Sequence, residues 1–186
     1  MTNDGKRVVI LDTSALVSGL DPFQISEEQY TVPAVAEEIS ASSMAAFRFK
    51  TAWDCQRVKV RVPRDSHVGT VRTAARLLGD ETFLSEADIQ VLALALELKA
   101  LDLEPTIATD DYSMQNVADY LEIEFISLAT LGIRFRLRWT IYCPACYRRY
   151  PANLKNTRCR ICGTILKRKP VRKKDIRPRK SWTNRR

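Results

Sequence analysis

Four of the five cysteines in the chain stand as two closely spaced pairs near its C-terminus. Cys143 and Cys146 form one Cys-x2-Cys pair, and Cys159 and Cys162 form a second pair twelve residues later. Two such pairs can close a tetrahedral shell of four thiolates around Zn²⁺, with bonds of about 2.3 Å. The alternative is a set of four buried thiols without a metal. We predict a structural zinc ion, because a closed shell leaves no position for a substrate or a catalytic water.

The segment that holds these cysteines is too short to build a core of its own. About 25 residues bury too little apolar surface to fold alone, whereas zinc binding can supply on the order of 10 kcal/mol of folding free energy. We therefore expect the metal to form the core of a small zinc ribbon. The fifth cysteine, Cys55, is too distant along the chain to be an obvious ligand, and we interpret it as a structural thiol.

Cysteine usage and the N-terminal residues indicate the compartment. Tight cysteine pairs favour metal binding over disulfides in a reducing compartment. No run in the sequence approaches the roughly 18 apolar residues needed to span a bilayer, and Met1–Lys6 lacks the apolar stretch of a signal peptide. We expect a cytoplasmic protein that does not act at a membrane, and the sequence leaves its oligomeric state open.

The two ends of the chain differ sharply in charge. Residues 1–135 carry 12 Lys and Arg against 21 Asp and Glu, a net charge of −9, and residues 136–186 carry 18 against 1, a net charge of +17. Such a dense positive segment is typical of proteins that bind a nucleic acid, although a solvated tail that aids solubility is the alternative. The total of 186 residues suffices for one ordinary domain and a small second one.

Hydrophobic patterns before the cysteines alternate between strands and helices. The apolar run at 8–17, broken by Asp12, predicts a buried strand with a carboxylate at its carboxyl end. Further strands are predicted at 57–63, 105–111 and 123–128, and helices at 33–39, 40–54, 67–79, 85–100 and 112–121. This order indicates an α/β fold with an open, mostly parallel sheet flanked by helices.

Acidic residues follow two of the predicted strands. Because ligands of open α/β sheets lie beyond the carboxyl ends of the strands, Asp12 and the pair Asp110 and Asp111 are expected to converge, with Glu38 and Asp88 as candidates to join them. Carboxylates in one cleft repel one another unless a cation neutralises them, which implies Mg²⁺ or Mn²⁺. Such a site can activate water for phosphodiester hydrolysis. Singly, each acid other than Asp12 can also be a helix cap or a solvent-facing residue.

The only histidine, His67, stands outside every acidic segment. This position disfavours nucleases that use a pair of histidines as general acid and base. We expect His67 to lie at the start of a helix without a catalytic role, so that hydrolysis would depend on the carboxylates.

Four segments resemble, in order and spacing, the acidic motifs of the PIN-domain ribonucleases: VILDTSAL, YTVPAVAEEI, LSEADIQVLALA and TDDYSMQNVA. Together with the cysteine segment introduced by RWTIYCPAC, they resemble the compact archaeal form of the Nob-one-type endoribonucleases, a PIN domain followed by a C-terminal zinc ribbon. Those enzymes mature the 3′ end of small-subunit ribosomal RNA. The resemblance covers about residues 6–169, and it is specific because all the motifs occur together in register.

The resemblance implies a set of catalytic acids: Asp12, Glu38, Asp88 and one of the final pair. The Thr-x-Asp pattern of the last motif selects Asp111, with Thr109 beside it, while Asp110 stays open. Asp12, Asp88 and Asp111 are the expected ligands of Mg²⁺ or Mn²⁺. The resemblance also implies two-metal-type hydrolysis that leaves 5′-phosphate and 3′-hydroxyl ends, and small-subunit pre-rRNA in a pre-ribosomal particle as the partner.

These observations divide the chain into four parts. We predict a PIN-like nuclease domain at 6–131, a linker at 132–141, a zinc ribbon at 142–169 and a basic, disordered tail at 170–186. The tail matches no motif, and its role is open.

Affinity for RNA is expected to come from the basic C-terminal part, since an acidic cleft repels RNA until cations bind. Its arginines, lysines and tyrosines suit phosphate contacts and base stacking. The candidates are Arg136, Arg138, Tyr147, Arg148, Arg149, Lys155, Arg158, Arg160, Lys167 and Arg168.

Two other functions remain open from the sequence. The chain could be an RNA-binding ribosome assembly factor whose acid cluster is inactive in isolation. It could also be a toxin-like PIN ribonuclease that cuts other RNAs, although such enzymes as a rule lack a zinc ribbon.

Overall fold

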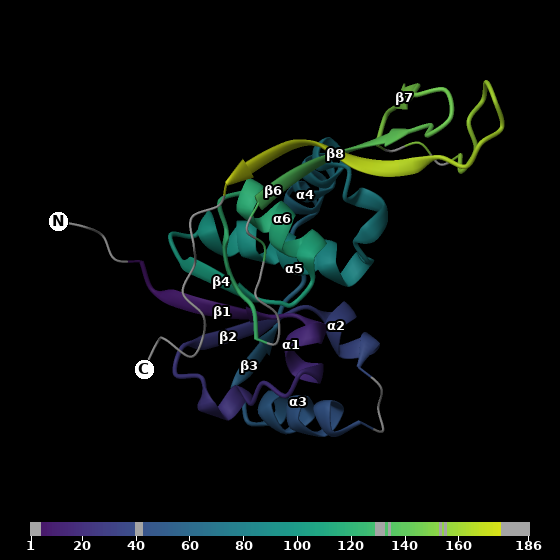
Figure 1. Cartoon of the computed structure of the whole chain (residues 1–186). Coiled ribbons are helices and arrows are strands. Elements are labelled where there is room, and N and C mark those ends of the chain that lie inside the picture. Colours follow the sequence, from purple (N-terminus) through teal and green to yellow (C-terminus); the bar gives the residue numbers. More distant parts are fainter. Residues whose placement is uncertain are drawn as a thin grey trace.

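The computed structural model describes residues 5–39, 43–128, 133, 135–152, 154 and 156–175. These residues form a parallel sheet flanked by helices and a smaller antiparallel sheet that extends from one end of it (Figure 1). We call residues 5–128 the main domain and residues 133–175 the ribbon module. Among the described residues, no helix has the length and apolar character needed to cross a membrane. The predicted α/β fold with an open parallel sheet is confirmed.

Five parallel strands form the central sheet in the order β3-β2-β1-β4-β5. They are β1 Arg7–Leu11, β2 Glu28–Thr31, β3 Val58–Val60, β4 Glu104–Ala108 and β5 Glu124–Ile126. β1 and β4 pair at the centre, with Leu11 opposite Ala108. The chain runs from β1 toward one edge of the sheet and later from β4 toward the other. The carboxyl ends of β1 and β4 therefore flank the switch point where ligands of such sheets bind.

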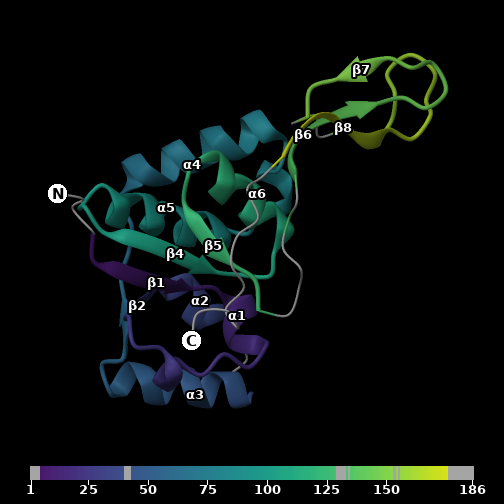
Figure 2. The same cartoon turned by 60° about the vertical axis from the view of Figure 1, so that its left-hand side comes forward.

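Helices cover both faces of this sheet. They are α1 Thr13–Val17, α2 Pro33–Glu38, α3 Met44–Asp54, α4 Asp65–Leu78, α5 Glu86–Lys99 and α6 Tyr112–Tyr120, with short 3-10 turns η1 Pro22–Gln24 and η2 Glu81–Phe83. Figures 1 and 2 show α4, α5 and α6 over one face and α3 over the other. The central helix of the core is α5, because nine of its 14 residues are buried.

The first strand covers the part of the apolar run that precedes Asp12, so the carboxylate follows its carboxyl end as predicted. β1 ends at Leu11, and Thr13–Val17 form helix α1 instead of continuing the strand. Asp12 causes this change, because its carboxylate accepts a hydrogen bond from Thr13 N at 2.7 Å and caps the helix. The helix predicted over 40–54 begins only at Met44, after the N-cap Ser43, and residues 40–42 lie outside the described part of the chain.

The sequence pattern does not predict strand β2. Two of its four residues, Gln29 and Thr31, are polar yet fully buried. Gln29 Nε2 donates to Pro22 O at 2.8 Å, and Thr31 Oγ1 donates to Leu11 O at 2.8 Å. These bonds satisfy the Gln29 amide nitrogen and the Thr31 hydroxyl, although Gln29 Oε1 is buried without a partner among the described residues. A strand can therefore form here without an apolar run.

The ribbon module is built on a three-stranded antiparallel sheet in the order β7-β6-β8. Its strands are β6 Phe135–Tyr142, β7 Arg149–Tyr150 and β8 Lys167–Asp175. The segment 132–141, predicted to be a linker, therefore supplies most of β6, and residues 170–175, predicted to belong to a disordered tail, form part of β8. β6 and β8 form by pairing with each other, and neither is evident as a strand from its own sequence. This explains why the sequence predicts a linker and a tail in their place. Residues 176–186 lie outside the described part of the chain.

Arg168 of β8 connects the ribbon module to the main domain through hydrogen bonds and ring contacts. Its Nη2 donates to Asp80 Oδ1 at 2.6 Å and to Gly79 O at 2.8 Å. Its guanidinium carbon lies 4.0 Å from the ring centroid of Trp139 and 4.1 Å from that of Phe83. A guanidinium held by an acid and two rings is fixed in place, so Arg168 is a structural contact rather than a free RNA-binding group.

Two further residue pairs join β6 to α6. Arg136 donates to Asp119 Oδ2 at 2.5 Å and to Asp119 O at 2.6 Å. Asn116 exchanges two hydrogen bonds with the backbone of Leu137, at 2.8 and 2.9 Å, and donates to Asp80 Oδ2 at 2.5 Å. We name the side chains of Asp80, Asn116, Asp119, Arg136 and Arg168 the latch. The latch uses two of the arginines that sequence reasoning assigns to RNA.

Replacing Glu97 by Gln should destabilise the main domain. Glu97 on α5 is 1% exposed and accepts hydrogen bonds from Arg61 Nη2 at 2.5 Å and Arg64 N at 2.8 Å. Glutamine would leave the guanidinium without its counter-charge, at a cost of about 2 kcal/mol in the free energy of unfolding. Urea denaturation measures this, and Glu86→Gln, which removes an exposed ion pair with Arg72, should cost less than about 0.5 kcal/mol.

The effect of Glu97→Gln should also depend on pH. Burial opposes ionisation of Glu97, but the Arg64 N–H and the charge of Arg61 outweigh it and hold the pKa of Glu97 below its ordinary value of 4.5. A carboxyl with a lowered pKa stabilises the folded state above its ordinary pKa and loses that contribution as the pH falls through the lowered value. The stability difference should therefore shrink below pH 4.5, and a difference that stays constant there would contradict the assignment.

Candidate active site and cysteine cluster

Asp12 lies at the carboxyl end of β1, beside the end of β4. Asp12 N donates to Ala108 O at 3.3 Å, which ties the two strand ends together. The carboxylate is 3% exposed and accepts hydrogen bonds from Thr13 N at 2.7 Å, Ser14 Oγ at 2.6 Å and Thr109 Oγ1 at 2.8 Å. Burial raises the pKa of Asp12, and these hydrogen bonds oppose the rise. Three donors fix both oxygens of a carboxylate that has little water around it.

Two hydroxyls connect the β1 end to the β4 end. Thr109 Oγ1 donates to Asp12 and accepts from Asp111 N at 3.1 Å. Ser14 Oγ donates to Asp12 and accepts from Asp110 N at 3.0 Å. Thr109 is fully buried and positions the acids instead of facing solvent. Sequence reasoning missed Ser14, whose only signal is its place two residues after Asp12.

The structure separates the roles of Asp110 and Asp111. Asp111 caps α6, and its Oδ1 accepts from Ser113 N at 2.6 Å and Met114 N at 3.0 Å. Asp110 Oδ1 accepts instead from Leu128 N at 3.0 Å, beyond β5. The geometry therefore favours Asp111 over Asp110 as a member of the acid cluster, in agreement with the Thr-x-Asp pattern.

Asp88 faces the same cluster from the first turn of α5. It forms a capping box with Ser85: Asp88 N donates to Ser85 Oγ at 3.1 Å, and Ser85 N donates to Asp88 Oδ2 at 2.7 Å. Burial, together with the charges of Asp12 and Asp111, raises the pKa of Asp88 to about 6 despite the bond from Ser85. Asp88 is therefore a helix cap that also lies within electrostatic reach of Asp12 and Asp111.

Glu38 lies at the rim of the cluster. It ends α2 and is exposed, and its Oε2 accepts a hydrogen bond from Thr13 Oγ1 at 2.7 Å. Thr13 is also the residue whose N–H caps Asp12. Glu38 is thus joined to Asp12 through one intervening residue.

The acid cluster (Asp12, Asp88, Asp111 and, at its rim, Glu38) suits a hydrated cation. In the described part of the chain, only the cysteines bring three or more ligand atoms within 4.8 Å of one another. The carboxylates are spaced more widely, which fits a cation such as Mg²⁺ that keeps several of its waters. A divalent ion would also relieve the repulsion that raises the pKa of Asp88.

Two other candidate residues lie outside the cluster. His67 is in the first turn of α4, with its Nδ1 3.9 Å from Glu97 Oε2, and among the described residues it makes no hydrogen bond or ion pair with Asp12, Asp88 or Asp111. Cys55 is the exposed C-cap of α3 and is separate from the other cysteines.

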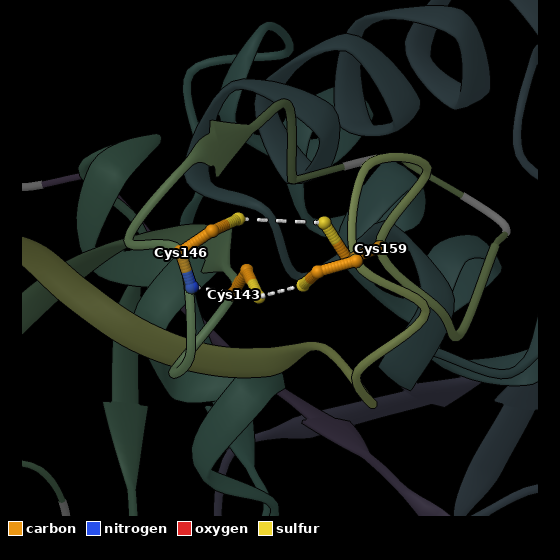
Figure 3. Close-up of side chains that lie close together, drawn as sticks. Cys143, Cys146 and Cys159 are labelled. Carbon is orange, nitrogen blue, oxygen red and sulfur yellow. Dashed lines mark hydrogen bonds between the residues drawn. The ribbon is translucent and has the colours of Figure 1, made fainter.

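The four remaining cysteines form one compact group between β6 and β8. The Sγ atoms of Cys143 and Cys162 are 3.4 Å apart, those of Cys146 and Cys159 are 3.6 Å apart, and all four lie within 4.8 Å of one another. Figure 3 shows Cys143, Cys146 and Cys159 pointing toward one another from facing loops. A tetrahedron with Zn–S bonds of about 2.3 Å has edges of about 3.8 Å. The cysteines could therefore hold zinc with little movement.

Hydrogen bonds to sulfur support these ligands. Cys146 N donates to Cys143 Sγ, and Ile161 N donates to Cys159 Sγ, each at 3.4 Å. The Tyr150 hydroxyl lies 3.1 Å from Cys159 Sγ, and its hydrogen bond, helped by backbone N–H groups, lowers the pKa of the Cys159 thiol to about 6. Such bonds favour the thiolate form that binds metal.

Most of the predicted RNA-binding side chains are available on the surface. The exposed ones are Arg138, Tyr147, Arg148, Arg149, Arg158, Arg160 and Lys167. Arg136 and Arg168 belong to the latch, and Lys155 lies outside the described residues. The exposed set forms a basic surface on the ribbon module.

Comparison with known proteins identifies the main domain. The family model described as the PIN domain of ribonuclease matches residues 9–98. Endoribonuclease Nob1 of Methanocaldococcus jannaschii is 36% identical over 174 residues, which are 94% of this chain and 83% of the relative. Endoribonuclease Nob1 of Pyrococcus abyssi is 34% identical over 91% of this chain and 98% of the relative. Ribonuclease VapC1 of Thermoplasma acidophilum is 32% identical over 91% of this chain and 81% of the relative.

These similarities cover more than nine tenths of the chain, and the PIN-domain match over 9–98 includes Asp12, Glu38 and Asp88. They confirm that the chain is a nuclease hydrolase with a PIN domain, a class that typically depends on divalent metal. The chain therefore belongs to the PIN-domain endoribonucleases, in the family of the archaeal Nob1 proteins.

Proposed function

We propose that this endoribonuclease matures the 3′ end of small-subunit ribosomal RNA in a pre-ribosomal particle. The observation that carries the proposal is that one chain joins a cluster of Asp12, Asp88 and Asp111 to a four-cysteine ribbon module with a basic surface. The relatives named Endoribonuclease Nob1 match across both parts. The paired thiols suit a reducing compartment, and we place the reaction in the cytoplasm.

We further propose that Asp12, Asp88 and Asp111 hold Mg²⁺ or Mn²⁺, and that the cysteines hold zinc. An ion held by these acids would supply an activated water and offset negative charge on the phosphate. The chain itself supplies fixed positions: Ser14 and Thr109 both donate to Asp12 Oδ2, and Thr13 N donates to Asp12 Oδ1. Groups that need not reorganise during the reaction are effective in catalysis, so these hydroxyls are positioning residues for the acids.

RNA affinity is proposed to come from the ribbon module, because the acid cluster repels a polyanion. The exposed arginines next to the cysteines can contact phosphates, and Tyr147, which is 77% exposed, can stack on a base. The ribbon module would thereby hold a single strand across the carboxylates of the main domain, where hydrolysis leaves a 5′-phosphate and a 3′-hydroxyl.

A toxin-like ribonuclease is the second candidate, because Ribonuclease VapC1 matches the chain nearly as extensively as the Nob1 proteins do. An assembly factor without activity in isolation is the third. A labelled RNA that spans the 3′ junction of the small-subunit rRNA, incubated with and without Mn²⁺, separates the three. A single cut at the junction supports our proposal, scattered cuts support the toxin-like enzyme, and no cut supports the assembly factor.

A further inference from the structure

A groove separates the end of α4 from the ribbon module. Its volume is about 430 Å³, and its walls include Leu77 of α4, Arg138 and Trp139 of β6, Arg149 of β7, and Pro151. This volume lies within the range of about 300–1,000 Å³ that is typical of small-ligand sites. The groove is large enough for one nucleotide.

The groove carries positive charge that is only partly offset by other groups in the described part of the chain. Arg76 at its edge is paired with Glu81 through two hydrogen bonds, at 2.7 and 3.0 Å. Arg138 and Arg149 are exposed, and neither side chain has a hydrogen bond or ion pair with another residue in the described ranges. Two guanidiniums without partners on one groove suit a phosphate, which accepts forked hydrogen bonds from arginine.

The same groove offers flat apolar surface. Trp139 and Pro151 line it from the ribbon module, and Leu77, which is 50% exposed, lines it from α4. An aromatic ring beside cationic groups is the usual platform for an unpaired base. Charge and shape together favour a single-stranded nucleotide over an acidic peptide, whose side chains have no flat face to stack.

The latch fixes the walls of the groove before any ligand binds. Arg168 lies 4.0 Å from the Trp139 ring and is anchored on Asp80. Gly79, with φ of +82°, lies so close to the ribbon module that a Cβ built on it would be 2.6 Å from Ala152 Cβ and 3.1 Å from Trp139 Cβ. The two parts of the chain therefore meet in one defined arrangement, and a preorganised site loses less entropy on binding.

The groove lies beside the end of α4 from which the chain leads on to the acid cluster. After α4 the chain passes through η2 to the first turn of α5, where Asp88 lies. Asn116, which binds Asp80 of the latch, lies on α6, whose N-cap is Asp111. One RNA strand can thus occupy the groove and continue toward the acid cluster.

We propose that this groove binds one unpaired nucleotide of the RNA substrate next to the segment that is cut. Arg138 and Arg149 hold its phosphate, and Trp139 with Pro151 and Leu77 contacts its base. The inference rests on the proposed function only in taking single-stranded RNA as the substrate.

The first test is RNA affinity in the full-length, zinc-loaded protein with Asp12→Asn to prevent cleavage. Adding Arg138→Ala and Arg149→Ala should weaken binding of a single-stranded junction RNA about tenfold or more. It should also reduce the slope of log affinity against log salt by about 1.4, the value for two lost phosphate contacts. The matched control is Arg7→Ala with Lys50→Ala, which removes the same charge from β1 and α3, away from the groove.

The second test is tryptophan fluorescence. Trp53→Phe and Trp182→Phe leave Trp139 as the only tryptophan of the three in the chain. RNA should quench its emission with the same affinity as in the binding assay, and a poly-glutamate peptide should not. Equal weakening in the control pair, unchanged emission, or equal quenching by the peptide would each overturn the proposal.

The two proposals fail in different ways. If the wild-type enzyme cuts the junction RNA but the groove variants bind it normally, the groove assignment is wrong and the proposed function stands. If RNA quenches Trp139 and the wild-type enzyme makes no junction cut, the groove assignment stands and the proposed function is wrong.

Discussion

Asp12→Asn should lower metal-dependent RNA cleavage by about three orders of magnitude or more while leaving the fold and RNA affinity intact. The side chain keeps its size but loses the charge that a divalent ion needs. The amide oxygen can still accept from Ser14 and Thr109, which both donate to one carboxylate oxygen, but the amide nitrogen cannot accept the hydrogen bond from Thr13 N. Initial rates on the junction RNA with saturating Mn²⁺, together with thermal unfolding, measure the two effects.

The same substitution should not lower stability. Burial raises the pKa of Asp12, which means that its ionised form is unfavourable in the folded protein. An uncharged amide removes this cost, which offsets the lost hydrogen bond from Thr13 N, so we expect a nearly unchanged unfolding temperature. Reduced cleavage together with a partly unfolded protein would contradict the assignment of Asp12 to catalysis.

Asp110→Asn is the matched control, because it makes the same chemical change in a neighbouring acid. Asp110 is bound to Leu128 N, whereas the charge of Asp111 helps to raise the pKa of Asp88. We therefore expect Asp111→Asn to be about as damaging as Asp12→Asn, and Asp110→Asn to retain most activity. The opposite order would exchange the roles of the two acids.

Cys159→Ser should release the metal and unfold the ribbon module. A structural zinc ion supplies on the order of 10 kcal/mol of folding free energy to a segment of this size, and Cys159 is a buried member of the group. The variant should lose one equivalent of zinc, and its ribbon module should become sensitive to protease. Elemental analysis and limited proteolysis measure these changes, and treating the wild type with a chelator should reproduce them.

Cys55→Ser is the control, since Cys55 is exposed on α3 and separate from the group. It should keep its zinc and its protease resistance. If Cys159→Ser also keeps a full equivalent of zinc, the metal is bound elsewhere and the cysteine cluster is not its site.

The sequence reveals the acids better than the groups that position them. Asp12 is evident because an ionised side chain beside four apolar residues is costly unless it has a use. Asp88 and Asp111 follow from the resemblance to PIN domains. Ser14 and Thr109 act through hydrogen bonds between two strand ends that are 95 to 97 residues apart. No pattern in the sequence shows that pairing before the sheet is known.

Sequence patterns also fail to show which arginines of the ribbon module are free to bind RNA. Composition correctly marks its segment as basic, but it cannot distinguish Arg138, which is exposed, from Arg168, which lies between two rings against Asp80. β6 and β8 become recognisable only as partners, because each is too charged to be predicted as a strand by itself. The pairing of segments far apart in the sequence therefore decides which basic side chains stay available to bind RNA.

The latch affects what can be learned from truncated forms of this enzyme. A fragment that ends before β6 would lose Arg168 and Leu137, leaving Asp80 and Asn116 without those partners. Asp80 is 2% exposed beside its cation, and the charge of Asp111 adds to the effect of burial in raising its pKa. The isolated nuclease half would therefore be a perturbed protein rather than a smaller version of the enzyme. Dissection by point substitution on the intact chain will give cleaner answers than truncation.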